Sequence, residues 1–208
     1  MYLPPKSRLA GRPGTRASLS APNRRCDRAT SGRSGPSCRL RARKRDLALF
    51  NLAIDSKLRG CDVVAVRVDD VAPSGYAMDR ATIRQKKTGR PVRFELTDQT
   101  RMAIDEYLRL TGRKPGQFLF AGRGDGARGL TTRQYARLVQ EWVASIGLDP
   151  AKFGTHSLRR TKAVLIYRRT GNLRAVQLLL GHSKIESTVR YLGIEVDDAI
   201  EIAEKIDI

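Results

Sequence analysis

The chain of 208 residues is long enough for one ordinary domain plus an extension, and its 40% of hydrophobic residues can form a core. Its 40 Lys and Arg residues outnumber 21 Asp and Glu residues, so the formal net charge is +19 and favours a polyanionic partner such as nucleic acid. The odd number of cysteines argues against a disulfide framework. No apolar run approaches the roughly 18 residues of a membrane span, and no signal-peptide core is found. We therefore expect a cytoplasmic protein with no membrane partner.

The first 44 residues form a low-complexity segment rich in Arg, Ser, Gly and Pro. Residues 1–45 contribute +12 to the net charge, whereas residues 46–208 contribute +7. A segment without apolar periodicity cannot bury enough surface to offset its ordering entropy. We therefore expect a disordered basic tail at 1–44 and a folded domain at 45–208. The tail could be a DNA-binding arm or a solvated extension without a role.

The first predicted helix begins near Arg45, carries apolar residues as far as Leu58 and is closed or bent by Gly60. Two short strands are predicted at 81–85 and 92–96, because the Thr-Gly-Arg-Pro sequence between them is typical of a turn. These strands form a small antiparallel sheet near the front of the domain.

From residue 97 onward the pattern is helical. The clearest helix is at 132–146, where apolar residues recur three and one apart and Gly147 follows as a stop. We expect its apolar stripe to be core; the stripe consists of Tyr135, Leu138, Val139, Trp142, Val143 and Ile146. Further helices are predicted at 97–110, 156–169, 172–180, 184–191 and 196–206. The predicted fold is mainly α with a small antiparallel β-sheet, an α+β architecture.

The chain contains only two histidines, and both have neighbours that suit phosphate chemistry. His156 and Arg159 are three residues apart, a spacing that puts an imidazole and a guanidinium on one helix face. His182 stands at a predicted helix stop, and Tyr191 follows nine residues later. A single histidine is more often a structural hydrogen-bonding residue than a catalyst. Two histidines, each beside a possible phosphate site, favour a chemical role.

Two stretches resemble the C-terminal motifs of the tyrosine recombinases, the phage integrase family. They are His-Ser-Leu-Arg-Arg-Thr, which begins at His156, and Leu-Leu-Gly-His-Ser-Lys-Ile-Glu-Ser-Thr-Val-Arg-Tyr, which ends at Tyr191. The family order is Arg, Lys, His-x-x-Arg, His or Trp, and Tyr, and the resemblance covers residues 45–208. It implies a DNA breaking-rejoining catalytic domain with these catalytic residues: Arg59, Lys87, His156, Arg159, His182 and Tyr191. Asp62 matches the acidic residue usual after the first arginine, and Lys86 is an adjacent alternative for the lysine.

The implied reaction begins with attack of the Tyr191 phenol on a DNA phosphodiester. A phenol with a pKa of about 10 is a poor nucleophile at neutral pH, but nearby cations favour the phenolate and could lower that pKa. Arg59 and Arg159 would bind the non-bridging phosphate oxygens through their planar guanidinium groups. His182 would donate one more hydrogen bond to the same oxygens.

The resemblance assigns the proton transfers to the remaining two residues. His156 would exchange a proton with the Tyr191 oxygen, and Lys87 would protonate the leaving 5′ oxygen. The product is a 3′-phosphotyrosyl link with a free 5′ hydroxyl, and attack by another strand restores the phosphodiester. No cofactor, metal or small-molecule substrate is implied, because the cations can replace a metal clamp.

The implied partners are double-stranded DNA and further copies of the chain. The predicted helix at 196–206 would dock on a neighbouring subunit, so that four protomers assemble on two duplexes, or pack on its own domain. The alternative function is a non-catalytic or truncated DNA-binding remnant, because the basic tail stands where the family usually carries a helical DNA-binding domain. The DNA target, and the choice between integration, excision and resolution, are not encoded in these motifs.

Overall fold

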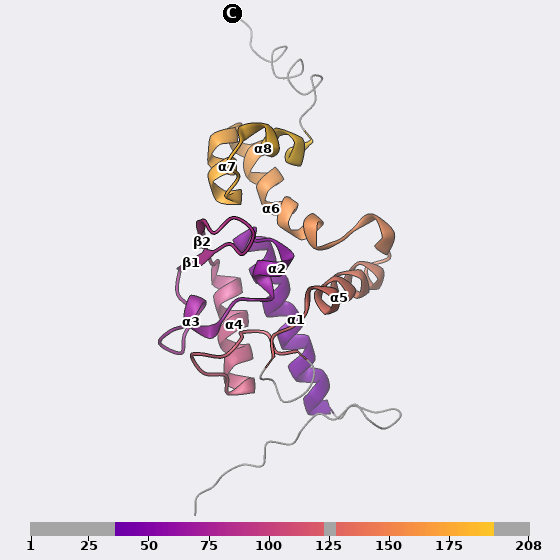
Figure 1. Ribbon diagram of the computed structural model, residues 1–208. Coiled ribbons are helices and arrows are strands. Elements are labelled where there is room, and N and C mark those ends of the chain that lie inside the picture. Colours follow the sequence, from indigo (N-terminus) through magenta and orange to yellow (C-terminus); the bar gives the residue numbers. More distant parts are fainter. Residues whose placement is uncertain (1–35, 123–127, 194–208) are drawn as a thin grey trace, which may run out of the picture.

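The computed structural model describes residues 36–122 and 128–193, with side chains from residue 40 (Figure 1). Helix α1 spans Pro36–Ser56, so it begins before the predicted start near Arg45. Proline suits the first helical position, and the Arg, Leu and Ala residues that follow are strong helix formers. Lys44 also forms an ion pair of 2.8 Å with Glu106 on helix α4 (Asp98–Thr111). Residues 36–44 are therefore helix and not tail, while 1–35 lie outside the described residues.

The chain after α1 contains two short helices, α2 (Gly60–Val63) and α3 (Val68–Val71). Gly60 therefore begins α2, contrary to the prediction that it closes or bends α1. The turn occurs earlier, at Lys57, whose φ of 53° lies in the left-handed region. Lys57 is buried, and its ammonium group donates to the Asp55 carbonyl oxygen.

Strands β1 (Arg80–Arg84) and β2 (Pro91–Glu95) form the antiparallel hairpin, one residue earlier than predicted. Ile83 pairs with Val92 across the hairpin, and this face is buried because side chains alternate along each strand. The opposite face carries exposed cations. Its cations and those of the connecting turn are Arg80, Arg84, Lys86, Lys87, Arg90 and Arg93.

Helices α4 (Asp98–Thr111) and α5 (Thr132–Ser145) complete the N-terminal unit, which we define as α1–α5 with the hairpin. Tyr135 and Val139 of α5 are buried in its core, whereas Trp142 is half-buried and packs edge-on against Phe50. The prediction that Ile146 belongs to the core is wrong, because the helix ends at Ser145 and Ile146 is 71% exposed.

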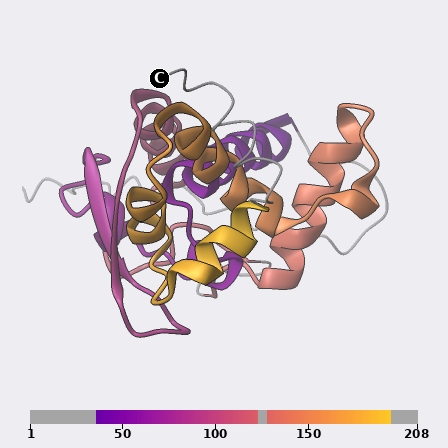
Figure 2. The ribbon, with the colours of Figure 1, turned by 90° about the horizontal axis from the view of Figure 1, so that it is seen from above.

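A 3₁₀ turn at Pro150–Lys152 leads to the C-terminal unit, which consists of α6 (Thr155–Thr170), α7 (Leu173–Leu180) and α8 (Ile185–Leu192). This unit contacts β2 on one side and α5 on the other, as Figure 2 shows. Its helix α6 also packs on α1. The predicted helix at 196–206 lies outside the described residues. Within the described ranges no helix is both long and apolar enough to cross a membrane.

Candidate active site

Arg159 is the buried centre of the candidate site. It lies on α6, is 3% exposed, and donates from Nη2 to the Leu180 carbonyl oxygen at 2.9 Å. Burial lowers the pKa of Arg159 below its ordinary value. The charges of Tyr191 and Asp62 oppose this lowering of the pKa, whereas the positive charge of Arg59 adds to it. Its Nε is buried and has no hydrogen-bond partner among the described residues, so Arg159 retains donor capacity for a ligand.

Arg59 reaches the same site from the N-terminal unit, at the residue that precedes α2. Its Nη1 donates to Oε1 of Gln85, a buried residue directly after β1. Asp62, in the first turn of α2, is buried and accepts the backbone N–H of Lys86 at 2.9 Å. Asp62 therefore holds the turn that follows β1 close to Arg59.

His182 is positioned by the stop of α7, where Gly181 takes a φ of 67°. Its Nδ1 lies 3.1 Å from the Thr188 hydroxyl, and its Nε2 lies 3.4 Å from Arg159 Nη2. Burial, then Arg159 and Arg59, lower the pKa of His182 to about 4, so the ring is neutral at pH 7.

The contacts of His182 determine which ring nitrogen holds the proton. A guanidinium can only donate, so Nε2 accepts from Arg159 and Nδ1 donates to Thr188. The role implied by the sequence, donation to a phosphate, instead requires the proton on Nε2. Thr188 can support both forms, because a hydroxyl can accept from Nδ1 or donate to it. The motif that ends at Tyr191 contains Thr188, but the sequence assigned it no role.

Tyr191 lies on α8, where its ring contacts both His182 and Arg159. Its ring centroid is 5.5 Å from that of His182, edge to face, and 5.6 Å from Arg159 Cζ. Burial raises the pKa of Tyr191, and Arg159, Arg160 and Arg59 oppose the rise. The pKa of Tyr191 is therefore raised, whereas the cations alone would lower it, because burial outweighs them.

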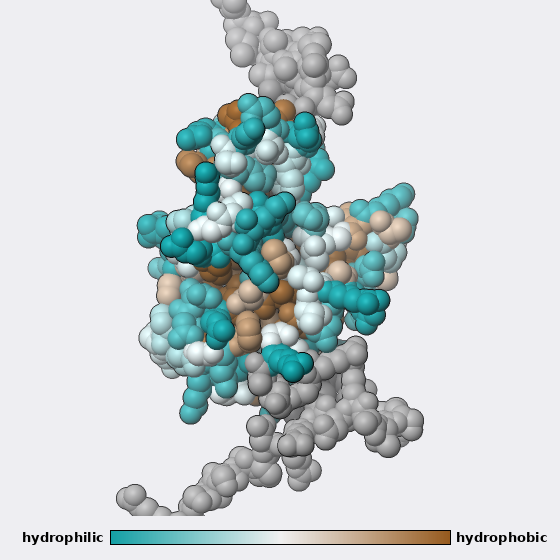
Figure 3. All heavy atoms as spheres, viewed as in Figure 1, coloured by the Kyte–Doolittle hydropathy of each residue, from teal (hydrophilic) through white to brown (hydrophobic). Residues whose placement is uncertain are grey.

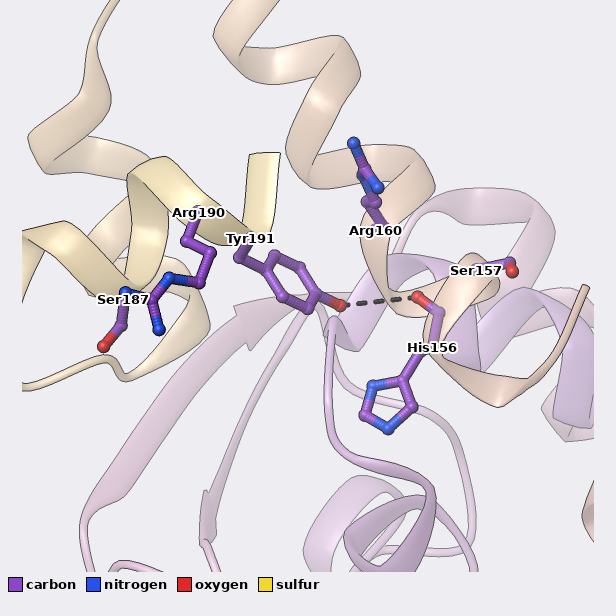
Figure 4. A pocket seen from close by; sticks show the side chains of 6 residues that line it. All are labelled: His156, Ser157, Arg160, Ser187, Arg190 and Tyr191. Carbon is purple, nitrogen blue, oxygen red and sulfur yellow. Dashed lines mark hydrogen bonds between the residues drawn. The ribbon is translucent and has the colours of Figure 1, made fainter. Parts of the chain in front are cut away.

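His156 contacts Tyr191 through its backbone. The Tyr191 hydroxyl donates to the His156 carbonyl oxygen at 3.3 Å, and the exposed imidazole is directed away from that hydroxyl (Figure 4). These residues border a pocket of about 450 Å³. Its lining consists of His156, Ser157, Arg160, Ser187, Arg190 and Tyr191.

Lys87 stands apart from the other candidates. It is exposed on the turn between β1 and β2, and within the described chain no hydrogen bond joins it to any of them. Lys86 is also exposed. The fold thus brings together Arg59, Arg159, His182, Tyr191 and the backbone of His156, and leaves the lysine at the margin. Among the described residues no cluster of His, Cys, Asp and Glu could hold a metal.

The sequence motifs did not point to Gln85 either. Ala81 and Ile83 are the inward-facing residues of β1, and Gln85 continues their alternation. A glutamine at an inward position of a strand pattern is a signal, because a buried amide needs hydrogen-bond partners.

Comparisons with known proteins agree with this fold. The family model described as "Phage integrase family" matches residues 37–196. "Probable integrase/recombinase YoeC" of Bacillus subtilis is 30% identical over 158 residues, which are 76% of this chain and 82% of that protein. "Tyrosine recombinase XerC" of Neisseria gonorrhoeae is 34% identical over 155 residues, 74% of this chain and 48% of XerC.

Solved structures show the same fold. XerA recombinase aligns with a TM-score of 0.64 at 19% identity, over 80% of this chain and 60% of the other. XerH recombinase, in a post-cleavage complex with its difH substrate, aligns with a TM-score of 0.66 at 21% identity. The alignment covers 84% of this chain and 48% of XerH.

The mainly helical fold with its small antiparallel sheet is that of tyrosine recombinase catalytic domains, as the sequence predicted. The chain belongs to the phage integrase family, and the enzyme class predicted from its motifs is confirmed. It spans about four-fifths of YoeC but only about half of XerC.

Proposed function

We propose that this chain cleaves and rejoins double-stranded DNA at a specific site through a covalent link to Tyr191. The observation that carries the proposal is the contact of the Tyr191 ring with Arg159 and His182. The positive charge of Arg59 lies close enough to favour a lower pKa for all three groups. A phosphate bound there would meet two guanidinium groups and a nucleophile. Guanidinium groups suit the charge that develops on non-bridging oxygens during phosphoryl transfer.

The exposed face of the hairpin supports DNA as the substrate. Hydrophilic residues gather over this part of the surface in Figure 3. The hairpin and its turn carry the exposed Lys and Arg side chains named above. Cations on one face displace counterions from DNA phosphates and so favour binding. The same hairpin carries Lys86 and Lys87, which would bring an ammonium group to the leaving 5′ oxygen.

In the proposed cleavage step, the Tyr191 oxygen forms a bond to phosphorus and the bond to the 5′ oxygen breaks. Lys87 supplies the proton that converts this oxygen to a hydroxyl. His156 takes the phenolic proton after its exposed imidazole changes rotamer, a motion that is fast for exposed side chains. Rejoining reverses both transfers, with His156 as the acid.

Covalent trapping tests the proposal directly. We would incubate the protein with labelled duplexes that carry single nicks and tile the genomic DNA flanking its gene. A nick beside the cut site lets the short fragment that carries the freed 5′ hydroxyl diffuse away, so an adduct that survives denaturing electrophoresis accumulates. We expect an adduct with the native chain, none with Tyr191→Phe, and an unchanged adduct with Tyr167→Phe, a matched control in the same helical unit.

The same assay separates the enzyme from its alternative. A non-catalytic DNA-binding remnant would retard these duplexes in a native gel without forming any adduct. Substitution of Arg159 by alanine should lower the trapping rate by roughly 100- to 1000-fold, the usual effect of removing one donor from a preorganised site. Equal trapping by Tyr191→Phe and the native chain would contradict the proposal.

The assembly and location of the chain are also proposals. Four protomers on two duplexes would follow from the predicted helix at 196–206, and a DNA substrate would place the protein in the cytoplasm. Light scattering of the trapped complex measures the first directly, with four copies per two duplexes expected.

A further inference from the structure

Gln85 is a buried amide with a partner at each of its polar atoms. The side chain is 1% exposed at the end of β1. Its Oε1 accepts from Arg59 Nη1 at 2.5 Å and from the Thr88 hydroxyl at 2.9 Å. Its Nε2 donates to the Leu180 carbonyl oxygen at 3.3 Å.

Each of these partners belongs to a different part of the candidate site. Arg59 stands before α2, and Thr88 lies in the turn directly after Lys87. The Leu180 carbonyl also accepts Arg159 Nη2, at 2.9 Å. One amide therefore connects Arg59, the lysine-bearing turn and, through one shared carbonyl, Arg159.

The packing around Gln85 leaves little freedom for another arrangement. A Cβ atom on Gly181 would lie 2.7 Å from Val92 Cγ2 and 3.0 Å from Gln85 Nε2. Gly181 also has a φ of 67°, a conformation that a side chain would strain. The end of α7, with His182 next in the chain, is thus pressed against the hairpin where Gln85 is held.

The contacts use both polar groups of the Gln85 amide. Arg59 and Thr88 both donate to the side-chain oxygen, and the Leu180 carbonyl accepts from the side-chain nitrogen as well as from Arg159. Glutamine offers an acceptor and a donor in one side chain, a glutamate would offer only acceptors, and a leucine neither. A guanidinium that is hydrogen-bonded at one end is also fixed in orientation, since its donors form a rigid planar fork.

We propose that Gln85 is a positioning residue, which sets the Arg59 guanidinium against the scissile phosphate and in register with Arg159. This inference rests on the proposed function of the site. Gln85 itself acts through Arg59 and touches no reacting atom. Thr88 shares the same acceptor oxygen but leads to the lysine turn, so it offers a matched comparison.

The test compares Gln85→Leu with Thr88→Val on three nicked duplexes. One carries a normal phosphodiester at the cut site. The second carries a methylphosphonate, which lacks the charged oxygen that a guanidinium neutralises. The third carries sulfur at the bridging 5′ position, a leaving group that needs no proton donor.

We expect Gln85→Leu to slow cleavage of the normal duplex by about 10- to 100-fold, less than outright removal of a donor. The deficit should shrink to a few-fold on the methylphosphonate and persist on the sulfur substrate. Thr88→Val should show the reverse pattern, with recovery on the sulfur substrate. Gln85→Glu, which keeps an acceptor for Arg59, should stay within a few-fold of the native rate.

Two results would overturn the inference: an unchanged rate for Gln85→Leu, or a deficit of equal size on all three substrates, which indicates a merely structural role. Circular dichroism melting checks folding, and Gln85→Met replaces the leucine variant if the latter does not fold. Failure of the native chain to form any adduct would instead overturn the proposed function itself.

Discussion

The two units of this molecule differ sharply in how they are held together. The N-terminal unit encloses a continuous core that includes Leu49, Leu52, Ile104 and Phe120. The C-terminal unit has a buried core of only Ala163, Val176, Leu180 and Leu192 within the described residues. Apolar burial stabilises folded chains in proportion to its area, so the second unit draws less stability from its own core.

Polar contacts between the units add stability that the small core of the C-terminal unit lacks. Lys162 on α6 forms an ion pair of 2.5 Å with Asp55 on α1, and Arg159 and Gln85 meet at the Leu180 carbonyl. Most candidate catalytic groups, including Tyr191, lie on the weakly packed unit, while Arg59 and the lysines lie on the other. The site is complete only when the two units are docked.

The largest expected effect comes from removing the carboxylate of Asp55. Burial raises the pKa of Asp55, but hydrogen bonds from Lys162, Thr100 and Thr97 outweigh it and hold the pKa below its usual value. Asp55→Ala leaves buried donors and a cation without their partner, and should lower the free energy of unfolding by about 3–5 kcal/mol. Urea denaturation measures this loss.

A carboxylate on the same helix provides the control. Among the described residues, Asp46 pairs only with its neighbour Arg45, at 2.7 Å, and Asp46→Ala should lower the free energy of unfolding by less than about 1 kcal/mol. Similar losses for the two variants would mean that the contact between the units contributes little.

Two leucine truncations sharpen the comparison of the cores. Leu180→Ala and Leu52→Ala each truncate a fully buried side chain. Each should lower the free energy of unfolding of the region around it by about 2–5 kcal/mol. If the C-terminal unit opens by itself, Leu180→Ala speeds amide hydrogen exchange in α7 and α8 and leaves α1 and α4 unchanged. Leu52→Ala should speed exchange in both units. Identical exchange patterns would show one cooperative core.

A further expected effect is the acid response of His182. Its folded-state pKa of about 4 lies below the 6.5 of the unfolded chain, so the unfolded state takes up a proton first as pH falls. Stability contributed by this group is therefore full above pH 6.5 and is lost between 6.5 and about 4. NMR titration of the imidazole should give the low midpoint, and Arg59→Leu should raise it. A midpoint near 6.5 in the native chain would contradict this account.

The order of motifs along the chain pointed to residues that the fold gathers from distant segments. Arg59, Arg159, His182 and Tyr191 meet although they come from both units. Periodicity also predicted the hairpin and helices α4 to α8 to within a few residues, because alternation and helical spacing are properties of neighbouring residues, but it did not predict the short helices α2 and α3. The start of α1 was missed, because the composition of the tail masked a run of good helix formers after Pro36.

The sequence by itself determined the family and most of the element types, and it supplied the candidate residues for this chemistry. Only the tertiary structure decided what surrounds them: the burial that raises the pKa of Tyr191, the proton on Nδ1 of His182, and the amide of Gln85 between the units. The reason is physical. Residue type and spacing are local, whereas desolvation and hydrogen-bond partners depend on segments far apart in the chain, which meet only when it folds.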